Sequence, residues 1–238
     1  MINHFTFNGY NSYSDMGMII TETPVFPSPE RDVDFVSIPG RSGDIIKDNG
    51  RFKNITVPYK MAFWKDGTPL STLINNIKAM LLSEAGYFKL CDTYHPGYFR
   101  YAAVSGSVSF ARKMELIGSG TIRFNCKPFL YRDDGEEITS FTSAGTLENP
   151  EAFPSKPYIK ITGSGNITMI VNNASFVFKD VEEYIEIDSE MMIAHKGTLS
   201  ANVKMYTQNF PELLPGENSI SWNGNVTSVE IKPRWCTV

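Results

Sequence analysis

Residues 55–63 read Ile-Thr-Val-Pro-Tyr-Lys-Met-Ala-Phe, and this stretch indicates the fold class of the chain. Large apolar side chains alternate with small or polar ones at a period of two, which is typical of a β-strand with one buried face. Pro58 has no N–H to donate to a neighbouring strand, so we expect this strand to lie at a sheet edge or to carry a bulge. Shorter segments with strand character lie at residues 35–38, 87–91, 103–110 and 120–128.

Residues 68–86 contain the one strongly helical pattern of the sequence. Apolar residues recur there at steps of three and four, which places them on one face of a helix. Thr68 suits the N-cap, Pro69 the first helical position and Gly86 the position after the end. We therefore predict a helix over about 69–85 whose apolar face packs against a core. This face consists of Leu70, Leu73, Ile74, Ile77 and Leu81.

The composition of the chain changes near residue 132. Residues 132–137 are mostly charged, and residues 140–157 carry Ser, Thr, Gly and Pro with little apolar periodicity. Such composition is typical of linkers and long exposed loops. We predict an N-terminal domain over residues 1–135, a linker or loop over 136–157 and a C-terminal domain over 158–238.

Strand patterns resume after residue 157 at short spacing. Apolar residues alternate on either side of Asn172-Asn173, a pair that suits a two-residue hairpin turn. Residues 219–231 show the same arrangement around Asn223-Gly224. Short strands without helices predict a β-sandwich. The chain is therefore expected to be mainly β, with two β-rich domains and one helix in the first.

The composition excludes several classes of protein. The 238 residues are 42% hydrophobic and 20% charged, so the chain is not expected to be disordered. A net charge of −4 argues against a basic surface for nucleic acids. Residues 1–8 lack the pattern of a signal peptide, and no apolar run is long enough to predict a membrane-spanning helix. Three widely spaced cysteines predict free thiols in a protein made in a reducing cytosol.

Motifs for catalysis or cofactor binding are missing from the sequence. The three histidines are isolated, and Gly118-Ser119-Gly120 and Gly163-Ser164-Gly165 lack the continuation of a phosphate-binding loop. We interpret both glycine motifs as turns that precede strands. We therefore predict a protein without catalytic residues, cofactor or metal.

Two further sets of residues admit more than one interpretation. Four carboxylates of equal parity suit a solvated strand face, although calcium binding or acid–base work stays open. These are Glu182, Glu186, Asp188 and Glu190. Three aromatic residues suit the core of the second domain, although aromatic faces also stack on sugar rings. These are Tyr158, Trp222 and Trp235.

Several segments together resemble the distal tail proteins of siphophages. The loop Ile38-Pro39-Gly40-Arg41 is the most telling of them, and the segments occur in the order typical of that family. In the first half they are residues 5–9, 14–20 and 37–43. In the second half they are residues 156–165, 184–190 and 209–218.

The resemblance implies a structural role without enzymatic activity. Members form a homohexameric ring at the tip of a long non-contractile phage tail, around a channel through which DNA passes. The N-terminal domain would be a β-sandwich or split barrel with one helix, related to tail tube proteins, and the C-terminal domain a galectin-like β-sandwich. The expected partners are the tail tube protein, the tail-tip protein and a receptor-binding protein. The chain has the length of a short member without an inserted carbohydrate-binding module.

Ring formation requires two different patches on each subunit. Edge pairing by residues 5–8 and 55–63 would supply one route, and an exposed arginine in a glycine loop another. The candidate interface residues are Phe5, Phe7, Arg41, Ile55 and Val57. The alternative function is a carbohydrate-binding adhesin for host surfaces, which would use Tyr158, Trp222 and Trp235.

Overall fold

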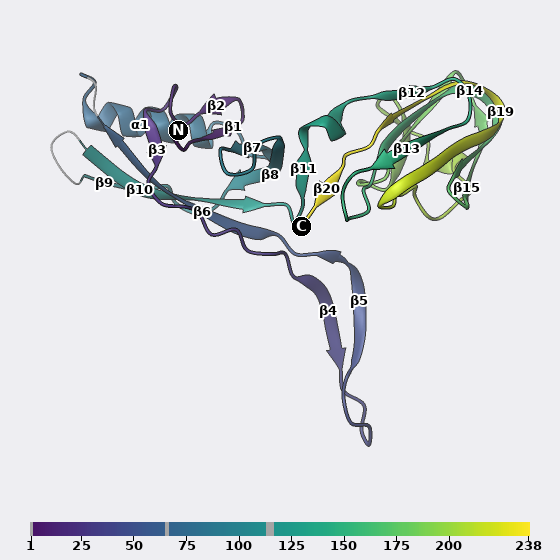
Figure 1. Cartoon of the computed structure of the whole chain (residues 1–238), viewed down its shortest axis with the longest axis horizontal. Helices are drawn as coiled ribbons and strands as arrows, with labels where there is room; N and C mark the ends of the chain where they lie inside the picture. The colour runs from purple at the N-terminus through teal and green to yellow at the C-terminus, as the bar shows by residue number, and fades with distance from the viewer. Residues whose placement is uncertain (1, 65–66, 113–116) are drawn as a thin grey trace. The chain divides into compact units, whose positions relative to one another are not determined.

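The computed structural model describes residues 2–64, 67–112 and 117–238 (Figure 1). The chain divides into two compact units, of which the first runs to Leu130 and includes Val238, and the second is Tyr131–Thr237. Strands dominate both units, and the described residues contain a single α-helix. The expected mainly β fold is therefore confirmed.

The first unit is built on one antiparallel sheet with the strand order β2-β1-β7-β8-β10-β6-β3. A short strand, β9, adds to β10. The strands are β1 (Phe5–Phe7), β2 (Tyr10–Asn11), β3 (Met18–Ile20), β6 (Ile55–Trp64), β7 (Phe88–Asp92), β8 (Tyr98–Val104), β9 (Phe110–Arg112) and β10 (Ile117–Cys126).

Strand β6 has the alternation that its sequence predicts. Every second side chain from Ile55 to Phe63 is buried, and β10 pairs with the whole strand. On the other side β3 reaches only Met61–Phe63. Thr21 N–H donates to Lys60 O, so the backbone of Lys60, and by parity that of Pro58, is directed away from β10. The nitrogen of Pro58 therefore faces a side where no described strand pairs, so its lack of an N–H costs no hydrogen bond. This agrees with the expected edge position.

The helix α1 (Leu70–Leu82) buries Ile77 and Leu81 in the core of the first unit. Leu70, Leu73 and Ile74 are partly buried against the same core, so the predicted apolar face is confirmed. Its ends differ from the prediction. Pro69 occupies the N-cap without a side-chain hydrogen bond, and the C-cap is Ser83 in right-handed geometry. Thr68 and Gly86 therefore have no capping role, because the chain leaves the helix before a left-handed residue is needed.

The second unit is built from two long strands, β14 and β19, whose ends have different neighbours. β16 pairs with the first half of β14 and β15 with its second half. In the same way, β13 pairs with the first part of β19 and β12 with its last part. The strands are β12 (Thr139–Phe141), β13 (Gly145–Asn149), β14 (Tyr158–Val171), β15 (Ala174–Val181), β16 (Tyr184–Asp188), β17 (Ile193–Lys196), β18 (Leu199–Ser200) and β19 (Gly216–Lys232).

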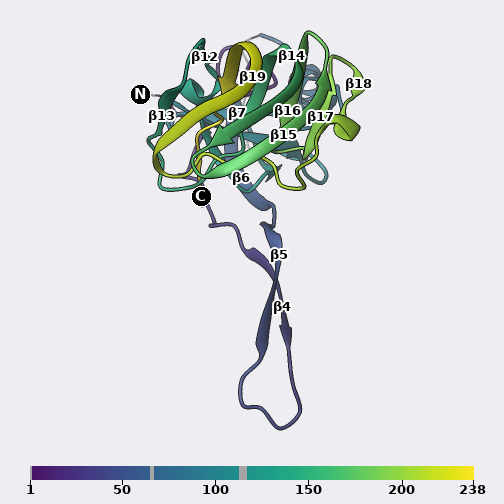
Figure 2. The same cartoon turned by 90° about the vertical axis from the view of Figure 1, so that its right-hand side faces the viewer.

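The sheet of the second unit curls around one core (Figure 2). Ile159 and Ile161 from the first half of β14 belong to the same buried cluster as Met169 and Val171 from its second half. Both halves of the long strands therefore face a shared interior. Four short elements complete the unit. They are β11 (Leu130–Arg132), which pairs with β20 (Cys236–Thr237), and the 3₁₀ turns Asp133–Glu136 and Asn202–Lys204.

Residues 136–157 differ from the predicted linker. They carry β12 and β13, both paired with β19. Buried Asn149 donates to Phe153 O and Leu213 O at 2.9 and 3.2 Å, and Ser155 N–H donates to Leu213 O at 2.9 Å. Leu213 lies far from both residues in sequence, and apolar periodicity carries no signal for such pairing.

The glycine motifs predicted as turns lie inside strands. Gly118-Ser119-Gly120 belongs to β10, where a Cβ on Gly118 would lie 2.2 Å from the Phe63 ring. Gly163-Ser164-Gly165 and Asn223-Gly224 lie at the bulge where the pairing of β14 and β19 shifts register. A Cβ on Gly163 would lie 2.3 Å from Asn225 O. Gly118 and Gly163 are therefore needed for the close approach of neighbouring atoms, whereas the predicted turn at Asn172-Asn173 is present between β14 and β15.

Candidate functional site

A long two-stranded hairpin extends from the start of β6 in the first unit (Figure 1). It consists of β4 (Arg31–Val36) and β5 (Ile45–Phe52), joined by a glycine-containing loop. Gly40 and Gly43 in that loop have φ values of +81° and +84°, which L side chains rarely adopt. Nearly every residue of the hairpin is exposed, so its two strands lie outside the core.

Ion pairs join the strands in the half of the hairpin nearest β6. Arg31 Nη1 lies 3.0 Å from Asp48 Oδ2, and Arg51 Nε lies 2.6 Å from Asp32 Oδ2. The hydrogen bond from Arg51 lowers the pKa of Asp32, with smaller contributions from nearby charges. Exposed ion pairs contribute little stability, and an isolated two-stranded hairpin is marginal in water. The contacts within the hairpin therefore stabilise it only weakly.

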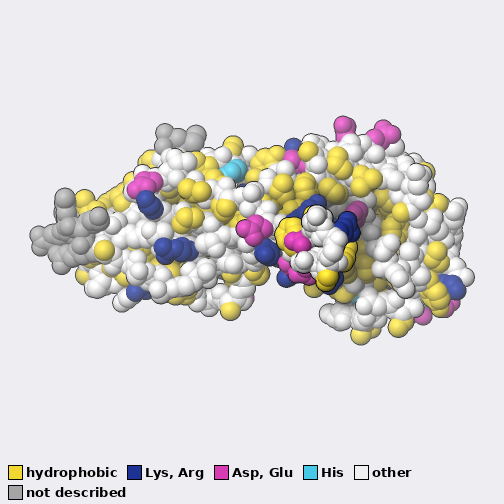
Figure 3. Space-filling model, turned by 90° about the horizontal axis from the view of Figure 1, so that it is seen from below, with side chains coloured by type: hydrophobic (Ala, Val, Ile, Leu, Met, Phe, Trp, Pro, Cys, Tyr) yellow, Lys and Arg dark blue, Asp and Glu magenta, His cyan; other side chains and the backbone are white. Residues whose placement is uncertain are grey.

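The half of the hairpin nearest its loop is apolar on both faces. Phe35 pairs with Ile46, and these side chains are 66% and 62% exposed. Their neighbours Val36 and Ile45 also pair and are exposed. Consecutive strand residues point to opposite faces, so the tip presents hydrophobic side chains in two directions. Figure 3 looks along the hairpin and shows charged and hydrophobic side chains crowded together on it. Such a cluster is characteristic of an interaction surface.

Arg41 is the one candidate interface residue that the structure places on this surface. It is exposed in the hairpin loop, and its N–H donates to Ile38 O at 3.1 Å. Among residues 2–64, 67–112 and 117–238, no side chain pairs with its guanidinium. The guanidinium is therefore available to a carboxylate or to carbonyl groups of another molecule.

The other four candidates lie in the core of the first unit. Phe5, Phe7, Ile55 and Val57 are between 0% and 5% exposed. β1 already pairs with β2 on one side and β7 on the other, so it offers no free edge. The sequence patterns identified buried strand faces correctly, but these side chains do not reach a surface.

The three aromatic residues considered for sugar stacking do not form one site. Tyr158 pairs with Lys232 at one end of β14, whereas Trp222 pairs with Met169 near the other. Trp235 is 5% exposed and belongs to the core. The Tyr158 hydroxyl donates a hydrogen bond to Glu186. Burial raises the pKa of Tyr158, and the Glu186 carboxylate raises it further. The core interpretation is therefore correct for Trp235, and Tyr158 has a partner within the unit.

The four acidic residues do not form a solvated face. Asp188 is 6% exposed and accepts two hydrogen bonds of 2.8 Å from Arg234. Glu186 accepts from Tyr158 and from Gly197 N–H. Partners outside β16 thus draw Glu186 and Asp188 inward. Within the described parts of the chain, no three His, Cys, Asp or Glu side chains are placed to hold a metal ion.

Two buried thiols are chemically quiet. Burial raises the pKa of Cys126 and of Cys236 to about 12 in each case, so both are protonated at neutral pH. Thiols in that state are poor nucleophiles.

In the residues that the structure describes, no helix is both long and apolar enough to cross a bilayer.

Sequence reasoning missed the hairpin as a unit. It identified residues 35–38 as a strand and residues 37–43 as a loop, but not the return strand β5. Asn49-Gly50 suggests a turn in that segment, whereas the structure places it inside β5 next to a register shift. The signal that could have identified β5 is a pair of apolar residues on each side of the glycine loop, Phe35-Val36 before it and Ile45-Ile46 after it.

The fold of the described residues is similar to that of a phage hub protein of known structure. Compared with solved structures, the chain matches the crystal structure of Dit (gp 19.1) of SPP1, whose title calls it a paradigm of the hub adsorption apparatus in phages that infect Gram-positive bacteria. The TM-score is 0.74 at 12% sequence identity, and the match covers 97% of this chain and 98% of that one. At this identity the match establishes the fold, as the resemblance led us to expect. No protein-family model and no curated protein matches the sequence.

Proposed function

We propose that this protein is a structural hub of a phage tail tip. The fold match carries the proposal, because it extends over 97% of this chain and 98% of a phage hub protein. The exposed hairpin supports it, since a protein that acts by assembly needs an apolar surface that is exposed in the single chain and covered in the assembly. The protein is proposed to act by shape.

The proposed assembly is a homohexameric ring in which the hairpin of one subunit lies on its neighbour. A closed ring needs two different patches that meet head to tail. The eight residues of β5 span roughly 26 Å, long enough to reach across a small domain surface. Burying Phe35 and Ile46 against a neighbour would remove their apolar surface from water. Arg41 at the tip would then meet carboxylate or carbonyl groups of that neighbour.

The ring would join the tail tube protein to the tail-tip protein and to a receptor-binding protein in the virion. DNA would pass through its channel without specific binding. The net charge of −4 per chain supports free passage, because an acidic or neutral lumen does not hold phosphates. The alternative, an adhesin that stacks sugars on Tyr158, Trp222 and Trp235, loses support because these residues lie apart.

Native mass spectrometry of the purified protein at high concentration, with electron microscopy of the particles, tests the ring. We expect six copies. The double substitution Phe35→Ser with Ile46→Ser should abolish the hexamer and leave the fold intact, because both side chains are exposed in the single chain. Arg41→Ala should weaken the hexamer.

The control is Val203→Ser, which removes an 84% exposed side chain from the second unit. It should leave assembly unchanged. A closed ring with another number of subunits, or hexamers that survive the double substitution, would contradict the proposal.

A further inference from the structure

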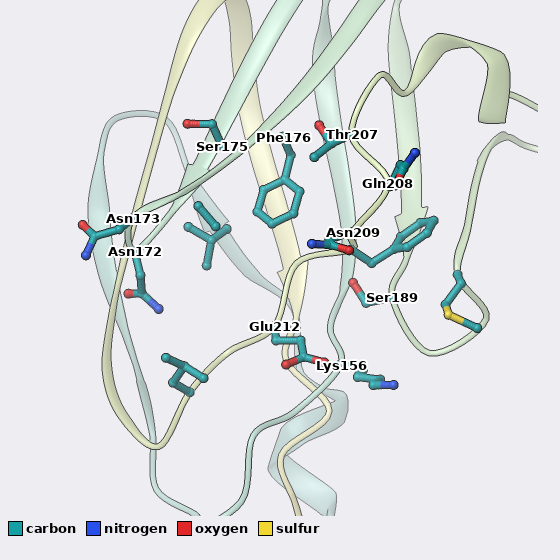
Figure 4. Close-up of a pocket in the computed structure, with 15 residues that line it drawn as sticks. Lys156, Asn172, Asn173, Ser175, Phe176, Ser189, Thr207, Gln208, Asn209 and Glu212 are labelled. Carbon is teal, nitrogen blue, oxygen red and sulfur yellow. The ribbon is translucent and has the colours of Figure 1, made fainter. Parts of the chain in front are cut away.

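A cleft of about 790 Å³ opens in the second unit beside the outer edge of β15 (Figure 4). Tyr206 N–H donates to Val177 O, and Val177 N–H donates to Thr207 Oγ1, so residues 206–207 cover the edge at Val177. The chain from Gln208 to Glu212 then lines the far side of the cleft, which leaves the start of β15 uncovered. The floor includes Ser189, which follows β16.

Polar groups around this cleft lack partners within the chain. Asn173, Gln208 and Asn209 are exposed, and the described residues provide no hydrogen bond to their side chains. Ser189 is 1% exposed, and its buried Oγ has no hydrogen-bond partner. A buried hydroxyl without a partner is unfavourable. With less than 1 Å² of accessible surface, Ser189 Oγ is closed to any ligand larger than water, so the exposed amides are the groups that a ligand can bond. Figure 4 shows these side chains arranged around the opening.

Charge and aromatic surface define the chemistry that the cleft accepts. Lys156 and Glu212 line it, and their opposite charges balance. Phe176 and Phe210 also line it, and Phe210 is only partly buried against the core. Neutral amides and hydroxyls beside an aromatic ring suit a ligand with many hydroxyl groups and an apolar face.

We propose that this cleft binds a neutral saccharide. The amides of Gln208 and Asn209 would each donate to one hydroxyl and accept from another. The C–H face of the sugar ring would pack against Phe210. This site does not include the three aromatic residues of the adhesin alternative, and it does not depend on the hub proposal.

An extended peptide fits the cleft less well. Strand addition requires a run of outward-facing backbone groups, which recur at every second residue along an edge. At the β15 edge Val177 is already bonded to residues 206 and 207, so Ser175 is the outward-facing residue of the strand that remains beside the cleft. An acidic saccharide is also disfavoured, because Glu212 offsets the single lysine of the cleft.

Saturation-transfer NMR and titration calorimetry on the full chain test the proposal. The probes are maltotriose, cellotriose and chitotriose, with trigalacturonate as the acidic probe. We expect at least one neutral trisaccharide to bind with a Kd on the order of 1 mM. Asn209→Ala and Gln208→Ala should each weaken binding about tenfold, the loss expected for one good hydrogen bond.

The matched control is Asn223→Ala, which removes an exposed amide from β19 outside the cleft. It should leave the affinity unchanged. The proposal is overturned if none of the neutral probes binds at about 10 mM, if Asn209→Ala and Asn223→Ala have equal effects, or if trigalacturonate binds more tightly than the neutral probes. Ring assembly does not enter any of these measurements.

Discussion

Asp188 shows how a single residue departs from its local pattern. Its place in an alternating strand suggested a solvated carboxylate, yet Arg234, which follows β19, lies against it at 2.8 Å. Burial by itself raises the pKa of Asp188, but the Arg234 guanidinium and the N–H groups of Met191 and Glu190 outweigh it, so the net pKa is lowered. The pair is then a source of stability that depends on pH.

We expect Asp188→Asn to lower the free energy of unfolding of the second unit by about 3 kcal/mol at pH 7, because Arg234 loses its buried partner. The folded-state pKa of Asp188 is lowered, so the contribution is complete above the unfolded value near 3.9 and is lost as pH falls through the folded pKa. The difference from the natural protein should therefore shrink below about pH 4. Denaturant titrations at pH 7 and at low pH measure it.

Glu182→Gln is the matched control, because the Glu182 side chain is 77% exposed and its ion pair with Lys204 is long at 3.8 Å. It should change stability little at either pH. A stability difference for Asp188→Asn that stays constant down to about pH 2 would show that the carboxylate charge is not involved.

At the scale of elements, the bulge between β14 and β19 decides how the second unit closes. There β14 exchanges β16 for β15 as its neighbour, and β19 follows it with a shifted register. Bulges increase the local bend and twist of a strand. The two long strands thereby fold their sheet around a single core, and glycine permits the close approach that this requires.

Gly163→Ala should destabilise the second unit by about 3 kcal/mol, because the new Cβ would collide with a backbone carbonyl, which has no freedom to rotate away. Gly165→Ala is the comparison: its φ of +78° costs an alanine about 1 kcal/mol, and its Cβ meets no atom within 4 Å. Urea unfolding of both variants measures the order. A larger loss for Gly165→Ala would contradict the assigned role of close approach.

At the scale of the whole molecule, the chain contains two separate hydrophobic cores. One is gathered around β6, β10 and α1, and the other around β14 and β19. A domain with its own core is able to unfold as its own cooperative unit. We therefore expect calorimetry to resolve two transitions.

Ile77→Ala should lower the free energy of unfolding of the first unit by about 3 kcal/mol, and with it the temperature of that unit's transition. Ile77 is 0% exposed, so its truncation leaves a cavity. Val171→Ala, at a site 2% exposed in the second core, should lower the other transition. If either substitution moves both transitions equally, the two cores do not unfold independently.

The sequence by itself determined the features that follow from local periodicity. Alternation identified β6 and its buried face, three- and four-residue steps identified the core face of α1, and Asn172-Asn173 identified a turn. These patterns are readable because a side chain's direction within a helix or strand is set by its immediate neighbours. The exposed position of Arg41 followed in the same way from its glycine loop.

Tertiary structure alone decided which strand faces find partners. Phe35 and Ile46 have the same apolar character as buried strand residues, yet they are exposed because no other described element of the first unit covers them. Residues 136–157 look like a linker, yet they pair with β19, and the cleft beside β15 exists because the chain leaves that edge after Thr207. Burial and hydrogen bonding at these places depend on segments far apart in sequence, and local periodicity holds no record of such contacts.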